Sequence, residues 1–327
     1  MIASQHAASS KEAVFSSSED QIRVGHVAVA GLPIASVKTY IPRITWINHA
    51  AAGLFSVLFP SDCRICGLPL LNISRLPVCP ECLDAIHPVA GKVCSICGER
   101  VLSAYAAHDL DGQLKCPVCR RIEHPFERAV AFGSYDSGLR ELIHLLKFNR
   151  VRPAASVLGR MLAETLAALE PWVGEGTIPV LPVPLYKGKR RQRGFNQAEL
   201  IVRAALKVYP QRDRFQLASD VLLRTRETHS QIGLSSHQRR ENLRGAFRVA
   251  RAGKVIGREV VLVDDVYTTG TTASECARVL RRAGASKVWV ATVARTLKLA
   301  SNQEAGFKLS KLQGFQEQTE SEETLAS

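Results

Sequence analysis

Residues 260–272 read Val-Val-Leu-Val-Asp-Asp-Val-Tyr-Thr-Thr-Gly-Thr-Thr. The four apolar residues at the start predict a buried strand, and two adjacent acids, Asp264 and Asp265, stand at its carboxyl end. A helical pattern over residues 273–283 follows the hydroxyl-rich turn. Ligands of open α/β sheets bind beyond the carboxyl ends of the strands. The free N–H groups at a helix N-terminus bind phosphate.

This stretch therefore predicts a site for a sugar phosphate with a free diol. The turn would hold the phosphate through N–H groups and hydroxyls, and the carboxylates would reach hydroxyls or a metal. The phosphate-binding candidates are Thr268, Thr269, Gly270, Thr271 and Thr272. The alternative is an ordinary strand–turn–helix, but such a turn needs neither two acids nor four threonines around a glycine. A Walker phosphate loop is excluded because the chain contains no Gly-x-x-x-x-Gly-Lys-Ser/Thr.

Residues 126–297 alternate apolar runs with helical patterns, and we expect them to form one domain. The predicted strands cover residues 129–135, 178–182, 260–263 and 287–294. The predicted helices cover residues 138–148, 154–169, 197–209 and 273–283. Such alternation predicts an α/β fold, with a mainly parallel sheet and helices on both of its faces.

The composition narrows the class of protein and of ligand. With 327 residues and 46% hydrophobic content, the chain has room for about two domains with a real core. Lys and Arg number 43 against 30 Asp and Glu, so phosphate-rich small molecules or nucleic acid are the favoured ligands. No apolar run is long enough to predict a membrane span, and no secretory signal is visible, so we expect a cytoplasmic protein.

The two ends of the chain differ from this pattern. We expect residues 1–43 to be a disordered extension, with a targeting role as the alternative. Residues 44–59 predict an amphipathic helix that packs on the following domain. Residues 298–327 are polar with several glutamates, which predicts a disordered tail.

Residues 60–122 hold eight of the nine cysteines, in four C-x-x-C pairs. Two such pairs complete a tetrahedral zinc site, so the segment predicts a double zinc ribbon with two structural Zn²⁺ sites. The ligands would be Cys63, Cys66, Cys79, Cys82, Cys94, Cys97, Cys116 and Cys119. Consecutive pairing is preferred, while a cross-braced pairing and a disulfide framework remain the alternatives. His87, His108 and His124 are expected not to be ligands, and Cys276 is expected in the core.

Two basic segments complete the predicted site. Residues 187–193 follow the strand 178–182 and hold no acid, which favours an anion site over a solvated charge run. The candidate contacts to pyrophosphate or DNA phosphate are Lys187, Lys189, Arg190, Arg191 and Arg193. Residues 223–244 form a long polar stretch that we predict to be a lid loop. The candidate lid residues are Arg224, Arg226, Gln231, Arg240 and Asn242.

The stretch 260–272 resembles the signature with which type I phosphoribosyltransferases bind phosphoribosyl pyrophosphate (PRPP). From about Leu58 to Thr296, the chain as a whole resembles the ComF family. The ordered features that carry this resemblance are the cysteine module, Leu146-Lys147-Phe148, Arg193-Gly194-Phe195-Asn196-Gln197, the run from Gln231 through Arg240 and Asn242 to Gly245-Ala246-Phe247, and the paired acids. The resemblance implies a type I phosphoribosyltransferase-like fold behind an N-terminal zinc ribbon, and Mg²⁺ with PRPP. It also implies a link to single-stranded DNA uptake in natural transformation.

Two functions follow from these features. As an enzyme, the protein would transfer 5-phosphoribose to an unidentified acceptor in nucleotide metabolism, with Asp264 and Asp265 as the catalytic pair. As a binding module, it would hold single-stranded DNA on its basic edge and stack bases on Tyr186, Phe195 or Phe148. We favour a PRPP-binding protein that acts in DNA uptake, with a DNA-uptake helicase or a processing protein as partner. Whether it turns over is left open.

Overall fold

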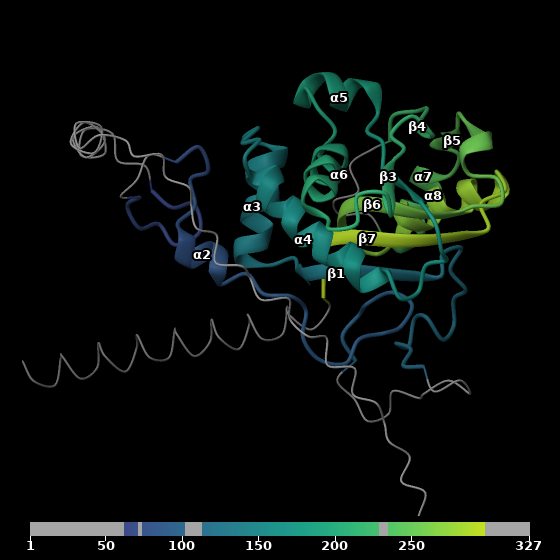
Figure 1. The fold of residues 1–327 in the computed structure, drawn as a ribbon, viewed down its shortest axis with the longest axis horizontal. Coiled ribbons are helices and arrows are strands. Elements are labelled where there is room, and N and C mark those ends of the chain that lie inside the picture. Colours follow the sequence, from purple (N-terminus) through teal and green to yellow (C-terminus); the bar gives the residue numbers. More distant parts are fainter. Residues whose placement is uncertain (1–61, 71–73, 102–112, 229–234, 298–327) are drawn as a thin grey trace, which may run out of the picture. The chain divides into compact units, whose positions relative to one another are not determined.

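The strand that carries the acid pair lies at the centre of a five-stranded parallel sheet (Figure 1). The computed structural model describes residues 62–70, 74–101, 113–228 and 235–297. The strand order is β1 (Arg128–Ser134), β7 (Lys287–Arg295), β6 (Glu259–Tyr267), β2 (Ile178–Pro182) and β3 (Phe215–Leu217). The predicted parallel sheet is therefore confirmed.

The register of the strands brings the predicted site segments to one edge of the sheet. Val263 pairs with Pro182, the last residue of β2, so the chain leaves β2 level with the acid pair. Ser134 of β1 and Tyr267 of β6 both pair with Arg295, the last residue of β7. Because the strands are parallel, the segments that follow them gather at this carboxyl edge, where ligands of such sheets bind.

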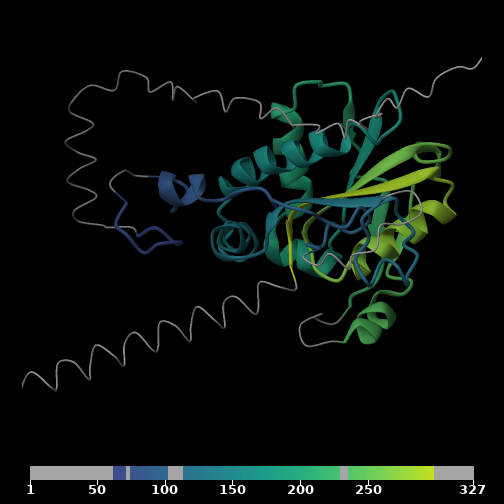
Figure 2. The ribbon, with the colours of Figure 1, turned by 90° about the horizontal axis from the view of Figure 1, so that it is seen from below.

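Helices cover both faces of the sheet (Figure 2). On one face α3 (Ser137–Lys147), α4 (Ala154–Leu169) and α6 (Gln197–Val208) share a hydrophobic cluster with odd-numbered residues of β6. On the other face α8 (Thr271–Arg282) shares a second cluster with even-numbered residues of β6. Alternate residues of a strand point to opposite faces, so β6 is apolar on both sides, as a buried parallel strand should be.

Several short elements occupy segments for which the sequence predicts no helix or strand. Besides β3 of the sheet, they are α5 (Lys187–Arg193), β4 (Leu222–Arg224), α7 (Ser236–Leu243), β5 (Phe247–Val249) and the 3₁₀ turn η1 (Ala252–Lys254). The strands β4 and β5 form an antiparallel hairpin, and α7 begins with a capping box between Ser235 and Gln238. Each element is too short to show a hydrophobic period, so sequence patterns alone miss them.

The cysteine module packs into the same two hydrophobic clusters. The first two C-x-x-C pairs and the short helix α2 (Pro80–Asp84) lie against α3, where a Cβ on Gly138 would stand 3.0 Å from Ile86 Cγ1. The last two pairs belong to the α8 cluster. There the Ala129 N–H of β1 donates to the Ile96 carbonyl at 2.7 Å. The module therefore continues the hydrophobic core of the sheet.

No helix in the described part of the chain is long and apolar enough to cross a membrane. The predictions for residues 1–43, 44–59 and 298–327 lie outside the described residues. The boundary between the zinc ribbon and the sheet domain stays a prediction.

Candidate functional site

Asp264 and Asp265 lie near the carboxyl end of β6. The Asp265 N–H donates to Asp264 Oδ1 at 2.9 Å, and the Asp265 residue is only 8% exposed. A buried carboxylate needs a partner for its charge. Lys147, the last residue of α3, supplies it, with Nζ 2.8 Å from Asp265 Oδ1.

The two acids are electrostatically unequal. Burial, followed by the neighbouring charge of Asp265, raises the pKa of Asp264 to about 7. Burial lowers the pKa of Lys147, but the attraction to Asp265 outweighs it, and the pKa is raised overall. The ion pair compensates Asp265, whereas no cation of the described residues forms an ion pair with Asp264.

Two arginines from other elements lie within electrostatic reach of the acids. Burial lowers the pKa of Arg193, at the end of α5, and the charge of Asp265 opposes that shift. Burial also lowers the pKa of Arg224, in β4, and Asp264 is among the charges that oppose it. The acid pair thus interacts with cations from three different elements, through an ion pair with Lys147 of α3 and at longer range with Arg193 and Arg224.

Lys147 is the site residue that sequence reasoning missed. It stands in the motif Leu146-Lys147-Phe148, but a lysine in the last turn of a helix is common for electrostatic reasons alone. The signal that could have identified Lys147 as a site residue was its place in the pattern shared with the ComF family. Its contact with the acids arises only from the packing of α3 on the sheet.

The turn after β6 requires a glycine for two reasons. Gly270 takes the left-handed conformation (φ 74°) at the N-cap of α8, and a Cβ there would overlap the Tyr267 hydroxyl. The hydroxyls of Thr269 and Thr271 lie 2.8 Å apart, and a small hollow lies between the turn and Asp264. The turn therefore presents N–H groups and hydroxyls beside the acid pair, which is the arrangement that binds a phosphate group.

Arg295 packs against the ring of Tyr267. The Arg295 guanidinium lies 4.6 Å from the centroid of the Tyr267 ring, and Arg295 is 5% exposed. Its Nη1 donates to the Cys97 carbonyl, and its Nη2 donates to Glu99 Oε2 at 2.9 Å. Arg295, the last residue of β7, thus connects the cysteine module to Tyr267, which packs against Gly270 of the phosphate turn.

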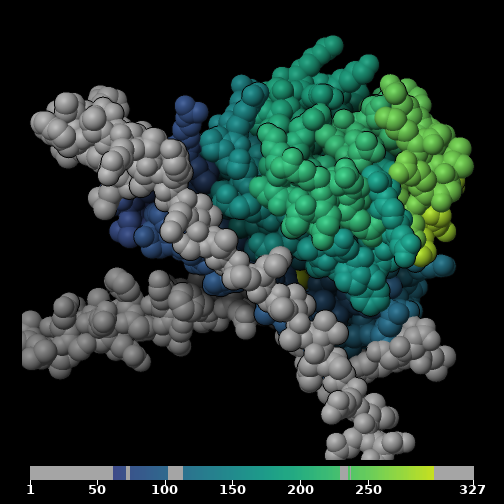
Figure 3. All heavy atoms as spheres, viewed as in Figure 1, coloured from purple at the N-terminus to yellow at the C-terminus, as the bar shows by residue number. Residues whose placement is uncertain are grey.

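The basic residues of α5 do not all reach the acids. Arg193 is the one whose pKa responds to the charge of Asp265, and its guanidinium lies 5.5 Å from the centroid of the Phe148 ring. The exposed or half-exposed residues are Lys187, Lys189, Arg190 and Arg191. Figure 1 shows α5 beyond the end of α6, and long side chains project from that part of the surface in Figure 3. These four residues form a cationic rim outside the acid site.

The segment predicted as a lid contains regular secondary structure among its described residues. Arg224, in β4, lies within reach of the acids, while Arg226 Nη2 donates to the Asn242 carbonyl at 2.9 Å and ties the two ends of the segment together. Arg240 is exposed on α7, and Gln231 lies outside the described residues. The end of β4 and the helix α7 therefore occupy part of the expected loop, and the closing motion stays a prediction.

The paired cysteines gather in two groups of four: Cys63, Cys66, Cys79 and Cys82, and Cys94, Cys97, Cys116 and Cys119. Within each group the Sγ atoms lie within 4.8 Å of one another, and all these thiols are free. The Cys66–Cys79 and Cys97–Cys116 sulfurs are 3.8 Å and 3.7 Å apart. Four sulfurs bound at about 2.3 Å in a tetrahedron are spaced about 3.8 Å apart. Both groups therefore fit a structural zinc ion, in consecutive pairing.

The two groups differ in their surroundings. Cys66 of the first group is exposed, whereas the second group is buried in the core. Burial raises the pKa of Cys63, but backbone N–H groups more than offset it and lower the value to about 6, which favours the metal-binding thiolate. In the second group His124 Nε2 lies 3.4 Å from Cys119 Sγ, so this histidine contacts a thiol from outside the set of four sulfurs.

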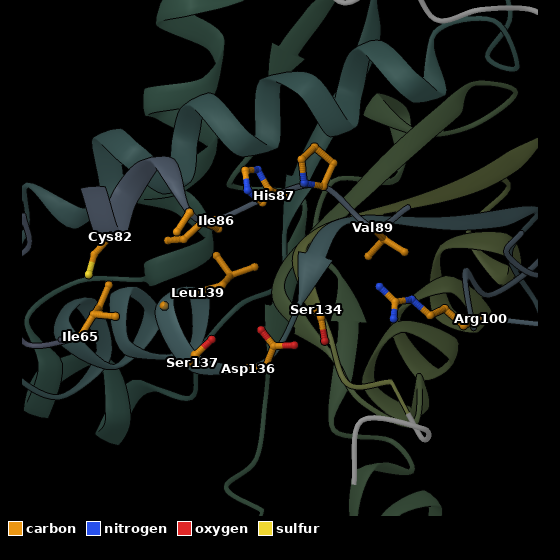
Figure 4. A pocket seen from close by; sticks show the side chains of 13 residues that line it. Ile65, Cys82, Ile86, His87, Val89, Arg100, Ser134, Asp136, Ser137 and Leu139 are labelled. Carbon is orange, nitrogen blue, oxygen red and sulfur yellow. The ribbon is translucent and has the colours of Figure 1, made fainter. Parts of the chain in front are cut away.

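A separate cavity of about 280 Å³ lies where the cysteine module meets β1 and α3 (Figure 4). Its apolar side includes Ile65, Ile86 and Leu139, and its polar side includes Arg100 and Asp136. The residues that line it include neither the acid pair nor the phosphate turn. This cavity is therefore distinct from the predicted site.

Known proteins resemble this chain over most of its length. A family model for the phosphoribosyl transferase domain matches residues 218–324, which include the acid pair and the turn. DNA utilization protein YhgH of Escherichia coli O157:H7 is 36% identical over 239 residues, which cover 73% of this chain and 98% of that protein. Competence protein F of Haemophilus influenzae is 30% identical over 228 residues, 69% of this chain and 93% of that protein. Competence protein ComFC of Streptococcus pneumoniae is 26% identical over 238 residues, with 69% and 96% covered.

The raised pKa of Asp264 predicts how stability depends on pH. Between about pH 4 and pH 7 the folded protein keeps a proton that the unfolded chain releases, so stability should fall as the pH rises through this window. Asp264→Asn should remove that fall and increase the free energy of unfolding at pH 8 by about 1–3 kcal/mol. Urea unfolding at pH 5 and pH 8, in buffer without added Mg²⁺, measures it. The exposed control Asp213→Asn should change neither value, and a variant that keeps the parent's pH dependence would contradict the assignment.

The sulfur geometry predicts about two zinc ions per chain in freshly purified protein. Cys119→Ser should remove one ion and lower the melting temperature more than Cys66→Ser does, because Cys119 lies in the core and Cys66 at the surface. Elemental analysis and thermal unfolding of the parent and both variants measure this. One ion or none in the parent, or equal destabilisation by the two substitutions, would refute the two-site interpretation.

Proposed function

Because the chain belongs to the ComF family, we propose that it binds PRPP with Mg²⁺ at the acid pair and handles single-stranded DNA on the adjoining basic edge. Its relatives and its fold identify it as a competence-related protein with a phosphoribosyltransferase-like domain. The names of those relatives concern DNA utilization and competence. The proposal includes a cytoplasmic location and a DNA-uptake helicase or processing protein as partner.

One observation carries the PRPP proposal. The acids and the glycine turn lie on consecutive residues of one chain segment, and cations from three other elements interact with the acids. A phosphosugar diphosphate has the matching parts: a 5′-phosphate, a diol and a pyrophosphate. The turn around Gly270 would take the 5′-phosphate, and Asp264, which forms no ion pair with a described cation, would accept hydrogen bonds from the ribose hydroxyls.

The three cations suit the pyrophosphate end of the ligand. Lys147, Arg193 and Arg224 are all at least half-buried, so their charges act at short range in a medium less polar than water. Carboxylates are the ligands that Mg²⁺ prefers, together with substrate phosphates. Bound there, the metal ion would neutralise pyrophosphate oxygens. Lys147 would then exchange its contact with Asp265 for a contact with phosphate.

Transfer of the phosphoribosyl group is the activity that this arrangement supports. The bond between ribose C1 and the pyrophosphate oxygen would break, and the electron pair would leave with pyrophosphate while a new bond forms from C1 to the acceptor. Positive charge develops on the ribose ring during this step, and the carboxylates of Asp264 and Asp265 would stabilise it. Arg193 and Arg224 would stabilise the departing pyrophosphate.

The DNA proposal depends on α5. Its exposed lysines and arginines lie at the sheet edge where the acid site opens, and no acidic residue interrupts them. Cations in such a row bind a phosphate backbone by releasing its counterions. One continuous surface would then bind the DNA backbone outside and the phosphosugar inside.

PRPP binding should depend on the charge of the acid pair. Asp264→Asn combined with Asp265→Asn keeps the side-chain shapes but removes two charge-assisted hydrogen bonds, each worth roughly 1.5–3 kcal/mol. The affinity for PRPP with Mg²⁺ should therefore fall at least about a hundredfold. Isothermal titration calorimetry measures the affinity, and circular dichroism verifies the fold.

A matched control, Asp213→Asn with Glu175→Gln, removes two exposed carboxylates elsewhere and should leave the affinity unchanged. If PRPP binds the acid-pair variant as well as it binds the parent, the signature is a relic of the fold and the enzyme proposal fails. Single-stranded DNA should bind that variant as tightly as the parent or slightly more tightly, because two negative charges are lost beside a basic edge.

Single-stranded DNA binding should be strongly salt-dependent, with α5 as a main source of the dependence. Replacing Lys189, Arg190 and Arg191 by glutamine should reduce the slope of log K against log salt by about 2, at roughly 0.7 per lost contact. Fluorescence anisotropy at several salt concentrations gives the slope. The control replaces Lys207, Arg212 and Arg282, exposed residues near the amino ends of the strands, and should leave the slope unchanged. An unchanged slope in the α5 variant would place the DNA elsewhere.

A further inference from the structure

Phe148 is an exposed aromatic side chain at the edge of the acid site. It follows the last residue of α3 and is 64% exposed, although burial of a phenyl ring is favourable. The other two aromatic candidates for base stacking are less available. Phe195 is 8% exposed, and Tyr186 is half-buried at the N-cap of α5.

Two links connect Phe148 to the acid pair. Its chain neighbour Lys147 contacts Asp265 at 2.8 Å. The Arg193 guanidinium, which is within electrostatic reach of Asp265, lies 5.5 Å from the centroid of the ring. The ring therefore stands next to the position where ribose and pyrophosphate are proposed to bind.

The ring is held in a defined orientation. His144, one turn earlier in α3, meets it edge-on, with 5.2 Å between ring centroids and an angle of 79°. The Tyr135 hydroxyl lies 3.1 Å from His144 Nε2. Beyond the ring, Arg150 takes a left-handed φ of 58° and donates to the Gln192 carbonyl of α5 at 2.6 Å. A non-glycine residue in that conformation is strained, which is most often seen at functional sites.

We propose that Phe148 is the stacking platform for a nucleobase at the mouth of the acid site. The ligand is a purine or pyrimidine ring, either as a free base or nucleoside that accepts phosphoribose or as a base of single-stranded DNA. This inference rests on the proposed function, since it supplies the missing base site next to the phosphosugar. Every base has a flat π-face, and a flanking arginine adds to such stacking.

The surroundings of the ring favour a base over a protein partner. The neighbours in sequence are Lys147, Asn149 and Arg150, and Arg193 lies over the ring. A large contiguous apolar patch marks a protein-docking surface, whereas a single aromatic ring among cations is the pattern of a nucleic-acid or nucleotide site.

The test compares Phe148→Ala, Phe148→Trp and the control Trp172→Ala. Trp172 is a second exposed aromatic residue, at 49%, and it also has an arginine over its ring, Arg128 at 3.7 Å. It lies near the amino ends of the strands, away from the acid site. The probes are oligothymidylate, an abasic strand of the same length, free adenine and uracil with PRPP present, and PRPP alone with Mg²⁺.

Phe148→Ala should weaken binding of oligothymidylate or of the free base about tenfold to a hundredfold, with the abasic strand and PRPP alone unaffected. Phe148→Trp should retain binding, and its fluorescence, taken as the difference between the Phe148→Trp variant and the parent, should be quenched by the base. Loss confined to the strand identifies DNA as the source of the base, and loss confined to the free base identifies the acceptor.

The proposal would be overturned by no loss in Phe148→Ala, by equal loss for the abasic strand, or by the same loss in Trp172→Ala. Weaker PRPP binding in Phe148→Ala would also overturn it, because the ring would then shape the phosphosugar site instead of stacking a base. Failure of the parent to bind PRPP is a separate outcome. It contradicts the proposed function while the strand measurement still decides the role of Phe148.

Discussion

The buried guanidinium of Arg295 is the interaction on which both parts of the described structure depend. A buried cation is stable only when its hydrogen bonds and its charge are satisfied, and here Glu99 and the Cys97 carbonyl of the cysteine module do both. The same guanidinium stacks on Tyr267, whose hydroxyl occupies the space that a side chain at position 270 would fill. The conformation of the phosphate turn is therefore connected, through two side chains, to the second group of cysteines.

The acid pair shows how a site can be less stable than the fold around it. Lys147 compensates one carboxylate, while burial and the neighbouring charge raise the pKa of the other. Asp264 forms no ion pair with a cation of the described residues, so it favours a metal ion or hydroxyl groups, which can compensate its charge. Proteins often hold ionisable groups with perturbed pKa values at functional sites, and the rest of the fold offsets the loss of stability. Here the offset comes from a β6 strand that is apolar on both faces.

Local patterns in the sequence were sufficient for four of the five strands of the sheet, its main helices and the grouping of the cysteines, but they missed the short edge strand β3. Strands and helices of this length carry clear periods, and a parallel strand order follows from their alternation. The short spacing within each C-x-x-C pair fixes two sulfurs at a time. The shorter elements could not be found in this way. The helix α5 and the hairpin of β4 and β5 bury few residues, so their apolar pattern is too short to recognise.

The sequence by itself determined the strand, the two acids and the glycine turn, because these residues are contiguous and their geometry is local. Only the tertiary structure decided which cations face the acids. Among the described basic residues of the two predicted segments, Arg193 and Arg224 interact with the acids, while the described cation that forms an ion pair with them, Lys147, comes from outside both segments. Lys147 and Asp265 are more than a hundred residues apart in the chain. Their contact is set by the register of the parallel strands and by the packing of α3 on the sheet, and no local pattern encodes it.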